Sequence, residues 1–434
     1  MLLHDFNSNV AFSLGHILPR IFYICWLLGG FAKPPIGLLL IIHELQFMTD
    51  YRKLSLDLHR QKQGKLSIQS KFPLETIEDL SIAYTPGVAE PCRSIHKDVN
   101  EAKNLTIKGN SVAVVSDGSA VLGLGDIGPE ASLPVMEGKC LLFKKFAGID
   151  AMPVVLAEHD IDKIVDTVMM ISPTYGGINL EDISAPACFE VEERLKEICS
   201  VPVMHDDQHG TAVVTLAGLI NTMRLTGKEL KDCKFVINGA GAAGVAIIKL
   251  LHHLGAENIL MLDSKGIIYQ GRENLNGSKN EIAGITNPHN VEGDLKEAIA
   301  GSDVFIGVSA PEILSEEMVR SMNEDPVIFA MANPVPEIMP DKAKEAGARI
   351  IATGRSDFPN QVNNVLAFPG LFRGILDSPA KQFTRDMFIA AAEAIADSVD
   401  EVSPEKIIPS PFQEDVAGNV AQSVRKVADQ QAVT

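Results

Sequence analysis

The chain has 434 residues, of which 22% are charged and 6% aromatic, and its formal net charge is −18. This length allows two or three domains with substantial cores, and the composition is that of a globular rather than a disordered protein. The negative charge argues against nucleic acid and anionic membrane surfaces as partners, because phosphates would be repelled. The six cysteines are scattered without a CxxC motif, which indicates reduced thiols and a cytoplasmic location.

Residues 1–47 differ from the rest of the chain. They hold only four formal charges and two apolar runs, 21–32 and 36–42, separated by Lys33 and two prolines. Each run is too short to span a bilayer, and the prolines would break a helix that joined them. We expect this extension to lie outside the fold, and the folded protein, with no membrane contact of its own, to start near Met48. A membrane anchor is the alternative.

Strands and helices alternate in two series after residue 107, which predicts mostly parallel sheets. The strands of the first series are expected at 111–115, 152–157, 177–181 and 201–207. Those of the second are expected at 235–238, 258–263, 303–309, 327–334 and 349–354, with a closing helix at 383–400. We therefore predict an α/β fold. An N-terminal α/β domain (48–207) precedes a C-terminal doubly wound Rossmann-type domain (208–434).

A dinucleotide-binding unit is predicted at residues 235–263. The buried strand FVIN leads into a glycine turn and a helix, and a second strand ends in Asp263. Gly239 would allow the tight turn, Gly241 the approach of the pyrophosphate, and Gly244 close packing of the helix on the sheet. The helix N-terminus, with Ala242 and Ala243, favours the phosphate charge. A glycine-rich turn without a ligand is the alternative.

Carboxylates gather at the ends of two expected strands. Glu181 and Asp182 follow one strand, and Asp206 and Asp207 end the next. Ligand groups meet at the carboxyl ends of parallel strands, and oxygen-only ligands favour Mg²⁺ or Mn²⁺ over zinc. Capping of the following helices is the alternative, because acids are common there. The neighbouring histidines, His205 and His209, are expected to be structural.

Seven motifs occur together in a fixed order, and their combination closely resembles malic enzyme in its short bacterial form. They cover about residues 50–425 and include YTPG, MEGK, LEDI, HDDQ, NGAGAAG, MANP and NNVL. The resemblance implies conversion of (S)-malate to pyruvate and CO₂ with reduction of NAD or NADP and a divalent metal. It also implies a homodimer. A plain malate dehydrogenase, an oxaloacetate decarboxylase and a non-catalytic NAD-binding module are the competing readings.

The resemblance also implies roles for individual residues. Lys139 of MEGK would be the general base that takes the proton of the C2 hydroxyl, which requires a lysine that is neutral near pH 7. Tyr84 of YTPG would be the acid that protonates the enol at C3. Asp206 would be a partner of the lysine. The metal ligands would be Glu181, Asp182 and Asp207.

The remaining implied roles concern substrate and cofactor. Asn333 and Asn364 would bind substrate, and Asn333 also the nicotinamide. Animal-type members carry a substrate-binding arginine where this chain has Ala120, so the metal, the asparagines and the backbone of the 123–128 loop would have to hold the substrate. For the cofactor, Asp263 favours NAD because it would repel a 2′-phosphate. Lys265, next to Ser264, could offset that charge and admit NADP; we favour NAD.

Overall fold

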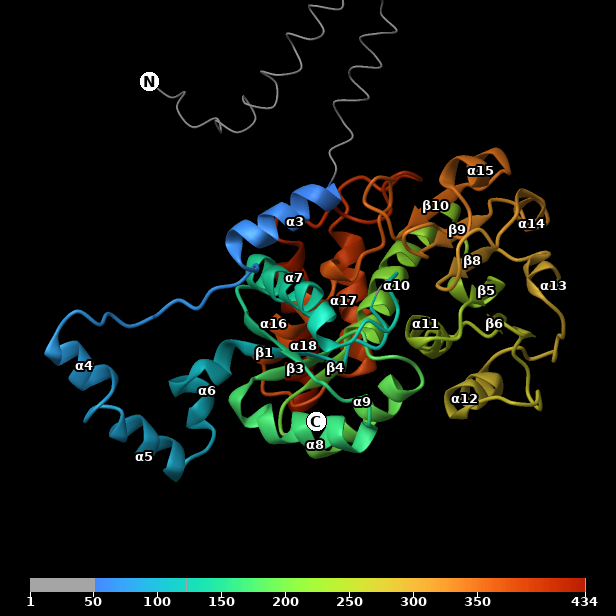
Figure 1. The fold of residues 1–434 in the computed structure, drawn as a ribbon. Helices are drawn as coiled ribbons and strands as arrows, with labels where there is room; N and C mark the ends of the chain where they lie inside the picture. Colours follow the sequence, from blue (N-terminus) through green and yellow to red (C-terminus); the bar gives the residue numbers. More distant parts are fainter. Residues whose placement is uncertain (1–50, 122, 434) are drawn as a thin grey trace, which may run out of the picture. The chain divides into compact units, whose positions relative to one another are not determined.

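The computed structural model describes residues 51–121 and 123–433 (Figure 1). The prediction for residues 1–47 therefore lies outside the described residues. The chain divides into two compact units, residues 1–64 and 65–434. The described part of the first unit is helix α3 (Tyr51–Lys62) and the turn that ends it.

The first sheet of the larger unit is a four-stranded parallel sheet in the order β2-β1-β3-β4. Strand alternation sends Val112 and Val114 of β1 into one core with Phe143, and Ala113 and Val115 into another with Val165. Helix α7 thus covers one face, and helices α8 and α9 the other. The elements are β1 (Ser111–Ser116), α7 (Pro129–Ala147), β2 (Asp150–Val155), α8 (Ile161–Ile171), η2 (Ser172–Thr174), β3 (Gly177–Leu180), α9 (Ala187–Ile198) and β4 (Val203–His205).

The second sheet has six strands in the order β10-β9-β8-β5-β6-β7. Its first five strands are parallel, which confirms the Rossmann-type prediction. Strand β7 pairs antiparallel with β6 and was not predicted. The elements are η3 (Leu230–Asp232), β5 (Phe235–Asn238), α11 (Ala242–His253), β6 (Ile259–Asp263), β7 (Gly266–Ile267), α12 (Gly277–Ile285), α13 (Leu295–Ile299), β8 (Val304–Gly307), α14 (Glu316–Arg320), β9 (Val327–Ala330), α15 (Pro340–Glu345) and β10 (Ile350–Thr353).

One long helix, α10 (Asp206–Thr226), runs from the first sheet to the second. Most of its residues are buried, and it packs against α11 and α17. The buried amide of Asn221 donates to the carbonyls of Ala396 and Ile407, 2.9 and 3.0 Å away. Near it lie η4 (Asn364–Leu366), α16 (Phe368–Leu376), α17 (Arg385–Asp397) and α18 (Val416–Val433).

Two predicted elements differ from the structure at their ends. The sequence pattern predicts a helix from about Met136 to Phe146, but helix α7 begins seven residues earlier, at Pro129, because Gly128 and a proline in the first turn form a good helix start. The strand predicted at 201–207 ends at His205, and Asp206 and Asp207 form the first turn of α10. Acids are favoured there by the helix dipole. The boundary that we expected between residues 207 and 208 thus falls inside a helix.

Residues 66–106, which we call the apolar arm, leave their apolar side chains exposed. The arm contains α4 (Ile77–Ala83), α5 (Ala89–Lys97) and α6 (Glu101–Leu105), and η1 (Ile107–Asn110) follows it. None of the three helices has a buried residue. The most exposed apolar side chains are those of Ile68, Ile77, Val99, Tyr84 and Leu74, at 65–88%. Exposed apolar surface is a common feature of interaction sites, so the arm is a candidate for one.

None of the helices in residues 51–121 and 123–433 is long and apolar enough to cross a membrane. The five cysteines in the same residues are free thiols.

Candidate active site

A buried lysine lies at the centre of the polar residues between the two sheets. Helix α7 carries Lys139, which is 8% exposed and whose Nζ lies 2.7 Å from Asp206 Oδ2 and 2.9 Å from Glu181 Oε1. Its ammonium also lies 4.4 Å from the centre of the Phe368 ring. Burial lowers the pKa of Lys139, but Asp206, Glu181 and Asp207 outweigh it and raise this pKa above its usual value. These carboxylates therefore favour the charged form of the lysine, whereas the general-base role implied by the resemblance needs the neutral form.

Three carboxylates form a possible cation site beside this lysine. One oxygen from each of Glu181, Asp182 and Asp207 lies within 4.8 Å of the others. Asp182 has a left-handed backbone (φ +54°), and its N–H donates to Asp207 Oδ2 at 2.8 Å. A buried oxygen of Asp182, Oδ2, has no hydrogen-bond partner within the part of the chain that the structure describes.

The electrostatics of these carboxylates fit a divalent cation. Burial and then the charge of Asp207 raise the pKa of Asp182 to about 7. Burial also raises the pKa of Glu181 well above its usual value, despite the nearby lysine. A cation would remove this repulsion and would use the unpartnered oxygen. Oxygen-only ligands suit Mg²⁺ or Mn²⁺.

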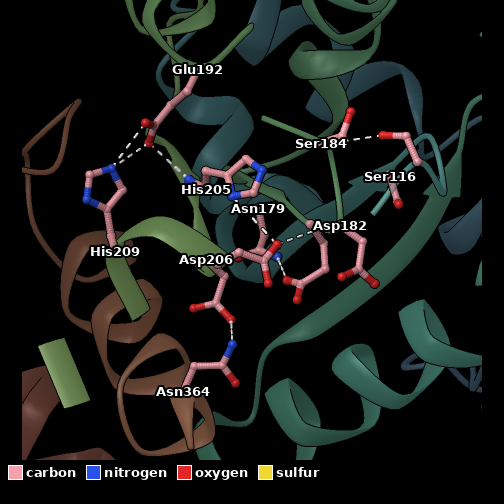
Figure 2. Close-up of polar contacts among 12 residues, drawn as sticks. Ser116, Asn179, Asp182, Ser184, Glu192, His205, Asp206, His209 and Asn364 are labelled. Atoms are coloured by element: carbon pink, nitrogen blue, oxygen red, sulfur yellow. Dashed lines mark hydrogen bonds and ion pairs between the residues drawn. The ribbon is translucent and has the colours of Figure 1, made fainter. Parts of the chain in front are cut away.

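Two asparagines hold the carboxylates in place. Asn179 of β3 is fully buried and donates to Glu181 Oε2 at 2.8 Å. Asn364, at the start of η4, donates to Asp206 Oδ2 at 2.6 Å (Figure 2). The structure thus brings the predicted Asn364 to the lysine and adds Asn179, which the sequence reasoning missed. Its position two residues before Glu181, and thus on the same face of β3, was the available signal.

A second buried group lies on the other side of α10. Glu192 of α9 accepts from the backbone N–H of His205 at 3.0 Å and pairs with His209 Nε2 at 2.9 Å (Figure 2). Lys196 pairs with the same carboxylate at 2.8 Å. The His209 ring stacks on Phe388 with a centroid distance of 4.6 Å. The His209 ring thus has an ion-pair partner and a stacking partner, whereas neither ring nitrogen of the buried His205 has a hydrogen-bond partner among the described residues. The buried Glu192 between the two histidines was not predicted.

The glycine turn between β5 and α11 has the geometry that the sequence predicts. Gly239 has a φ of +128°, and a side chain there would meet the carbonyl of Val308. A Cβ on Gly244 would lie 1.9 Å from the carbonyl oxygen of Gly239, so the helix packs closely on the turn. At Gly241, the residue before α11, nothing lies within 4 Å of such a Cβ. A cavity of about 620 Å³ opens at this turn and reaches Asp263 and Ser264.

Asp263, at the end of β6, has two cationic partners that the sequence reasoning missed. Its Oδ2 lies 2.5 Å from Arg272 and 2.6 Å from Lys279. Burial raises the pKa of Asp263, but the hydrogen bonds from these two residues lower it to about 2. The predicted neighbour, Lys265, is exposed and contributes its backbone N–H, 2.9 Å from Asp263 Oδ1.

The glycine loop of the first sheet approaches the second sheet near Asn333. A Cβ built on Gly123 would lie 3.6 Å from the carbonyl oxygen of Asn333. The N–H of Ala120 donates to the carbonyl of Asp182 at 3.0 Å. The loop, Asn333 and the carboxylates are therefore neighbours, as expected.

Tyr84 is the predicted site residue that the structure does not bring to Lys139. It ends helix α4 in the apolar arm, and its side chain is 67% exposed. Among the described residues, its side chain has no hydrogen bond to the lysine or to the carboxylates. For Tyr84 to act as the acid, its side chain would therefore have to reach Lys139 in an arrangement other than the one within this single chain.

Both halves of the chain match models of one family. Residues 63–160 and 157–196 match the malic enzyme N-terminal domain, and residues 208–429 match the malic enzyme NAD-binding domain. The chain belongs to the malic enzyme family. This match confirms the resemblance to malic enzyme that the motifs show, and it confirms the α/β fold with a Rossmann-type domain.

Known malic enzymes resemble the chain over most of its length. It is 60% identical to the bifunctional malic/malolactic enzyme of Bacillus subtilis, over 87% of this chain and 93% of that protein. It is 55% identical to the NAD-dependent malic enzyme of Geobacillus stearothermophilus, over 84% and 77% of the two chains. Among solved structures, the NAD-dependent malic enzyme of Thermotoga maritima is 50% identical, with a TM-score of 0.82 and coverage of 85% and 98%.

Proposed function

We propose that this malic enzyme oxidises (S)-malate and releases CO₂ to form pyruvate, with reduction of NAD and with a divalent metal. The observation that carries the proposal is the contact of Lys139 with Asp206 and Glu181, next to a cluster of three carboxylates. A module that only binds NAD would need neither a buried lysine nor such a cluster. Relatives named NAD- and NADP-dependent malic enzymes support the same reaction.

The carboxylates of Glu181, Asp182 and Asp207 would hold Mg²⁺ or Mn²⁺. A cation held there would supply Lewis acidity for the oxidation of malate and the release of CO₂. Its charge would also offset the negative charge that raises the pKa of Lys139.

The residues around the cation would move protons and orient the substrate. Lys139 would take the proton of the C2 hydroxyl as hydride passes to the nicotinamide. Asp206 and Asn364, which are bonded to each other, would fix the position of the lysine. Asn333 would orient the substrate and the nicotinamide amide. The backbone of the 123–128 loop would contact the substrate carboxylate, since Ala120 cannot.

The pyrophosphate would lie on the turn of Gly239, Gly241 and Gly244, against the start of α11 at Ala242 and Ala243. We propose NAD as the preferred cofactor, because the pairing of Asp263 keeps its carboxylate charged and able to accept the ribose 2′-OH. Lys279 lies at the same carboxylate and would offset repulsion of a 2′-phosphate. NADP should therefore be used more slowly rather than excluded. The ratio of kcat/KM for the two cofactors measures this preference.

We further propose a homodimer in which the apolar arm of one chain brings Tyr84 to Lys139 of the other. The exposed tyrosine and the unburied helices α4 to α6 support this arrangement. A second copy is the occupant that fits best, because the arm carries a residue for which this same chain has a site. A cytoplasmic location, supported by the free thiols, belongs to the same proposal.

The decisive experiment follows NADH and CO₂ formation by the full chain with (S)-malate, Mn²⁺ and NAD. The wild type should form both, and Lys139→Ala should form neither while binding NAD with unchanged affinity. NADH without CO₂ would identify a plain dehydrogenase, and CO₂ release from added oxaloacetate alone would identify a decarboxylase. Absence of turnover with both cofactors would refute the proposed reaction.

Mixing two inactive variants tests the dimer. If Tyr84 acts on the partner chain, then Lys139→Ala and Tyr84→Phe chains mixed after unfolding and refolding should recover about a quarter of the wild-type activity. Half of the dimers would be mixed, and each would have one intact site. If Tyr84 acts within its own chain, the mixture should stay inactive.

A second candidate reaction is the conversion of malate to lactate and CO₂. The relative that is 60% identical is named a bifunctional malic/malolactic enzyme. In this reaction the NADH formed with pyruvate would return its hydride to the pyruvate carbonyl, so that no net reduction of NAD occurs. Release of lactate with catalytic amounts of NAD would establish it, and pyruvate as the sole product would exclude it.

A further inference from the structure

A second, larger cavity lies away from the lysine and the carboxylate cluster. Its volume is about 940 Å³, and it lies between helices α9, α10, α11, α12 and α17. It is lined on α10 by Gln208 and His209, which lie on a different side of this helix from Asp207. None of the proposed metal ligands lines it. The volume is at the upper end of small-molecule sites, which suits a ligand larger than a simple ion.

One buried donor at this cavity has no acceptor. Gln208 is 5% exposed, and its side-chain Nε2 has no hydrogen-bond partner in residues 51–121 and 123–433. Buried amide groups are almost always paired in folded proteins, because an unpaired N–H loses its bonds to water without compensation. An acceptor atom on a ligand in the cavity would satisfy it.

Positive groups surround the same space. Helix α12 begins here, and the N–H groups of Gly277 and Ser278 in its first turn have no acceptor within the helix. Lys249 also lines the cavity, where it pairs with Glu281. Arg385 also lines the cavity, and the structure gives it no acidic partner in residues 51–433. Together these groups favour a negatively charged ligand.

Most of the lining acids already have cationic partners. Glu192 pairs with Lys196 and His209, Glu281 with Lys249 at 2.7 Å, and Glu190 with Arg194 at 3.3 Å. Glu193 is the lining acid that has no cationic partner among the described residues, and it is exposed to solvent, as is Arg385. The acids therefore do not cancel the attraction of an anion to Arg385 and to the start of α12.

The rest of the cavity wall is apolar and partly aromatic. It includes the side chains of Phe189, Leu250, Phe383 and Phe388. Phe383 and Phe388 stack on each other with a centroid distance of 5.8 Å. The flat apolar part of a ligand would bury surface against these rings, and its charged group would lie at Arg385 and the start of α12.

We propose that this cavity binds an organic anion of nucleotide size, with its ring system on the phenylalanines and its anionic group at Arg385 and the start of α12. The site is separate from the dinucleotide cavity, because the two cavities share no lining residue. Its ligand is an effector rather than a substrate, because no group of the proposed reaction lines the cavity.

Contacts of one buried residue, Glu192, link the cavity to the start of α10. Glu192 connects Lys196 and His209 at the cavity to the backbone N–H of His205, the residue before Asp206. An anion that draws Lys196 and His209 away from Glu192 would loosen the start of α10, which carries Asp207. This consequence rests on the proposed function, and it predicts weaker binding of Mn²⁺ when the cavity is filled.

Isothermal titration calorimetry on the full chain, saturated with NAD so that the dinucleotide site is filled, tests the site directly. Adenosine 5′-monophosphate is the probe, with citrate and inorganic phosphate as anions that lack a ring. The wild type should bind the monophosphate more tightly than either. Arg385→Ala and Gln208→Leu should each weaken binding by about tenfold or more. Arg349→Ala, a change at an exposed arginine outside the cavity, should leave it unchanged.

Each outcome decides a part of the proposal. Absence of binding by all three probes at millimolar concentration, or equal binding by the wild type and both cavity variants, would overturn the site. Equal binding of phosphate and the monophosphate would overturn the nucleotide-sized ligand. Binding of the monophosphate with unchanged Mn²⁺ affinity, measured by electron paramagnetic resonance, would overturn the effector role. These readouts do not depend on turnover, so they remain valid if the proposed reaction fails.

Discussion

A methyl group added at Gly244 should disrupt the dinucleotide turn. The Cβ of Gly244→Ala would lie 1.9 Å from the carbonyl oxygen of Gly239, and an ordinary contact of 3.4 Å requires a shift of about 1.5 Å. The turn cannot yield easily, because the N–H of Gly239 is bonded to the carbonyl of Leu262 at 3.0 Å and its Cα faces Val308. Either the turn or α11 must therefore move.

The expected magnitude follows from two opposing effects. Overpacking in a closely packed region costs about 1–3 kcal/mol, while alanine in place of glycine within a helix gains about 1 kcal/mol. Gly244→Ala should therefore lose about 0–2 kcal/mol of unfolding free energy. Its affinity for NAD should fall by about tenfold or more, because the displaced turn no longer directs its N–H groups at the pyrophosphate.

Gly284→Ala in helix α12 is the matched control. Nothing in the described residues lies within 4 Å of a Cβ at that position. Only the higher helix propensity of alanine therefore affects stability, and the variant should be as stable as the wild type or up to about 1 kcal/mol more stable. Urea denaturation measures stability, and quenching or enhancement of NADH fluorescence measures affinity. Unchanged NADH affinity in Gly244→Ala would refute the reasoning.

Two other predictions concern charge. Mn²⁺ should raise the thermal unfolding midpoint of the wild type but not of Asp207→Asn, measured by differential scanning calorimetry, because binding to the folded state alone stabilises it; an equal rise in both would place the metal elsewhere. Because the pKa of Asp263 is lowered to about 2, from about 3.9 in the unfolded chain, its contribution to stability is present above about pH 4 and is lost as the pH falls towards about 2. Asp263→Asn should therefore show a smaller loss of stability than the wild type between those pH values in urea titrations. An identical dependence of the unfolding free energy on pH in the two proteins would contradict the ion pairs.

The sequence predicted the features that depend on neighbours along the chain. Alternation of buried strands and helices predicted both sheets, and the spacing of Gly239, Gly241 and Gly244 predicted a turn whose geometry the structure reproduces. Strand β7 was missed because two residues leave no periodic pattern. The end of β4 was misplaced, because a strand end and a helix start can hold the same acids.

Contacts between distant residues were beyond the sequence patterns. The partner of Asp263 was sought two residues away at Lys265, but Arg272 and Lys279 reach it across a loop and a helix. The raised pKa of Lys139 depends on Asp206 and Glu181, which other elements bring to it. The exposed position of Tyr84 depends on how the apolar arm folds. No local pattern encodes these three-dimensional distances.

Helix α10 has a consequence for recombining parts of this enzyme. Its first two residues are Asp206 and Asp207, while the rest of the helix packs against α11 and α17. A chimera joined at residue 207 would take the carboxylates from one parent and the helix that orients them from the other. Gly227, whose left-handed backbone ends the helix, offers a better crossover point. Exchange of cofactor domains between malic enzymes should therefore keep α10 with the carboxylates, so that a change in cofactor preference leaves the metal site intact.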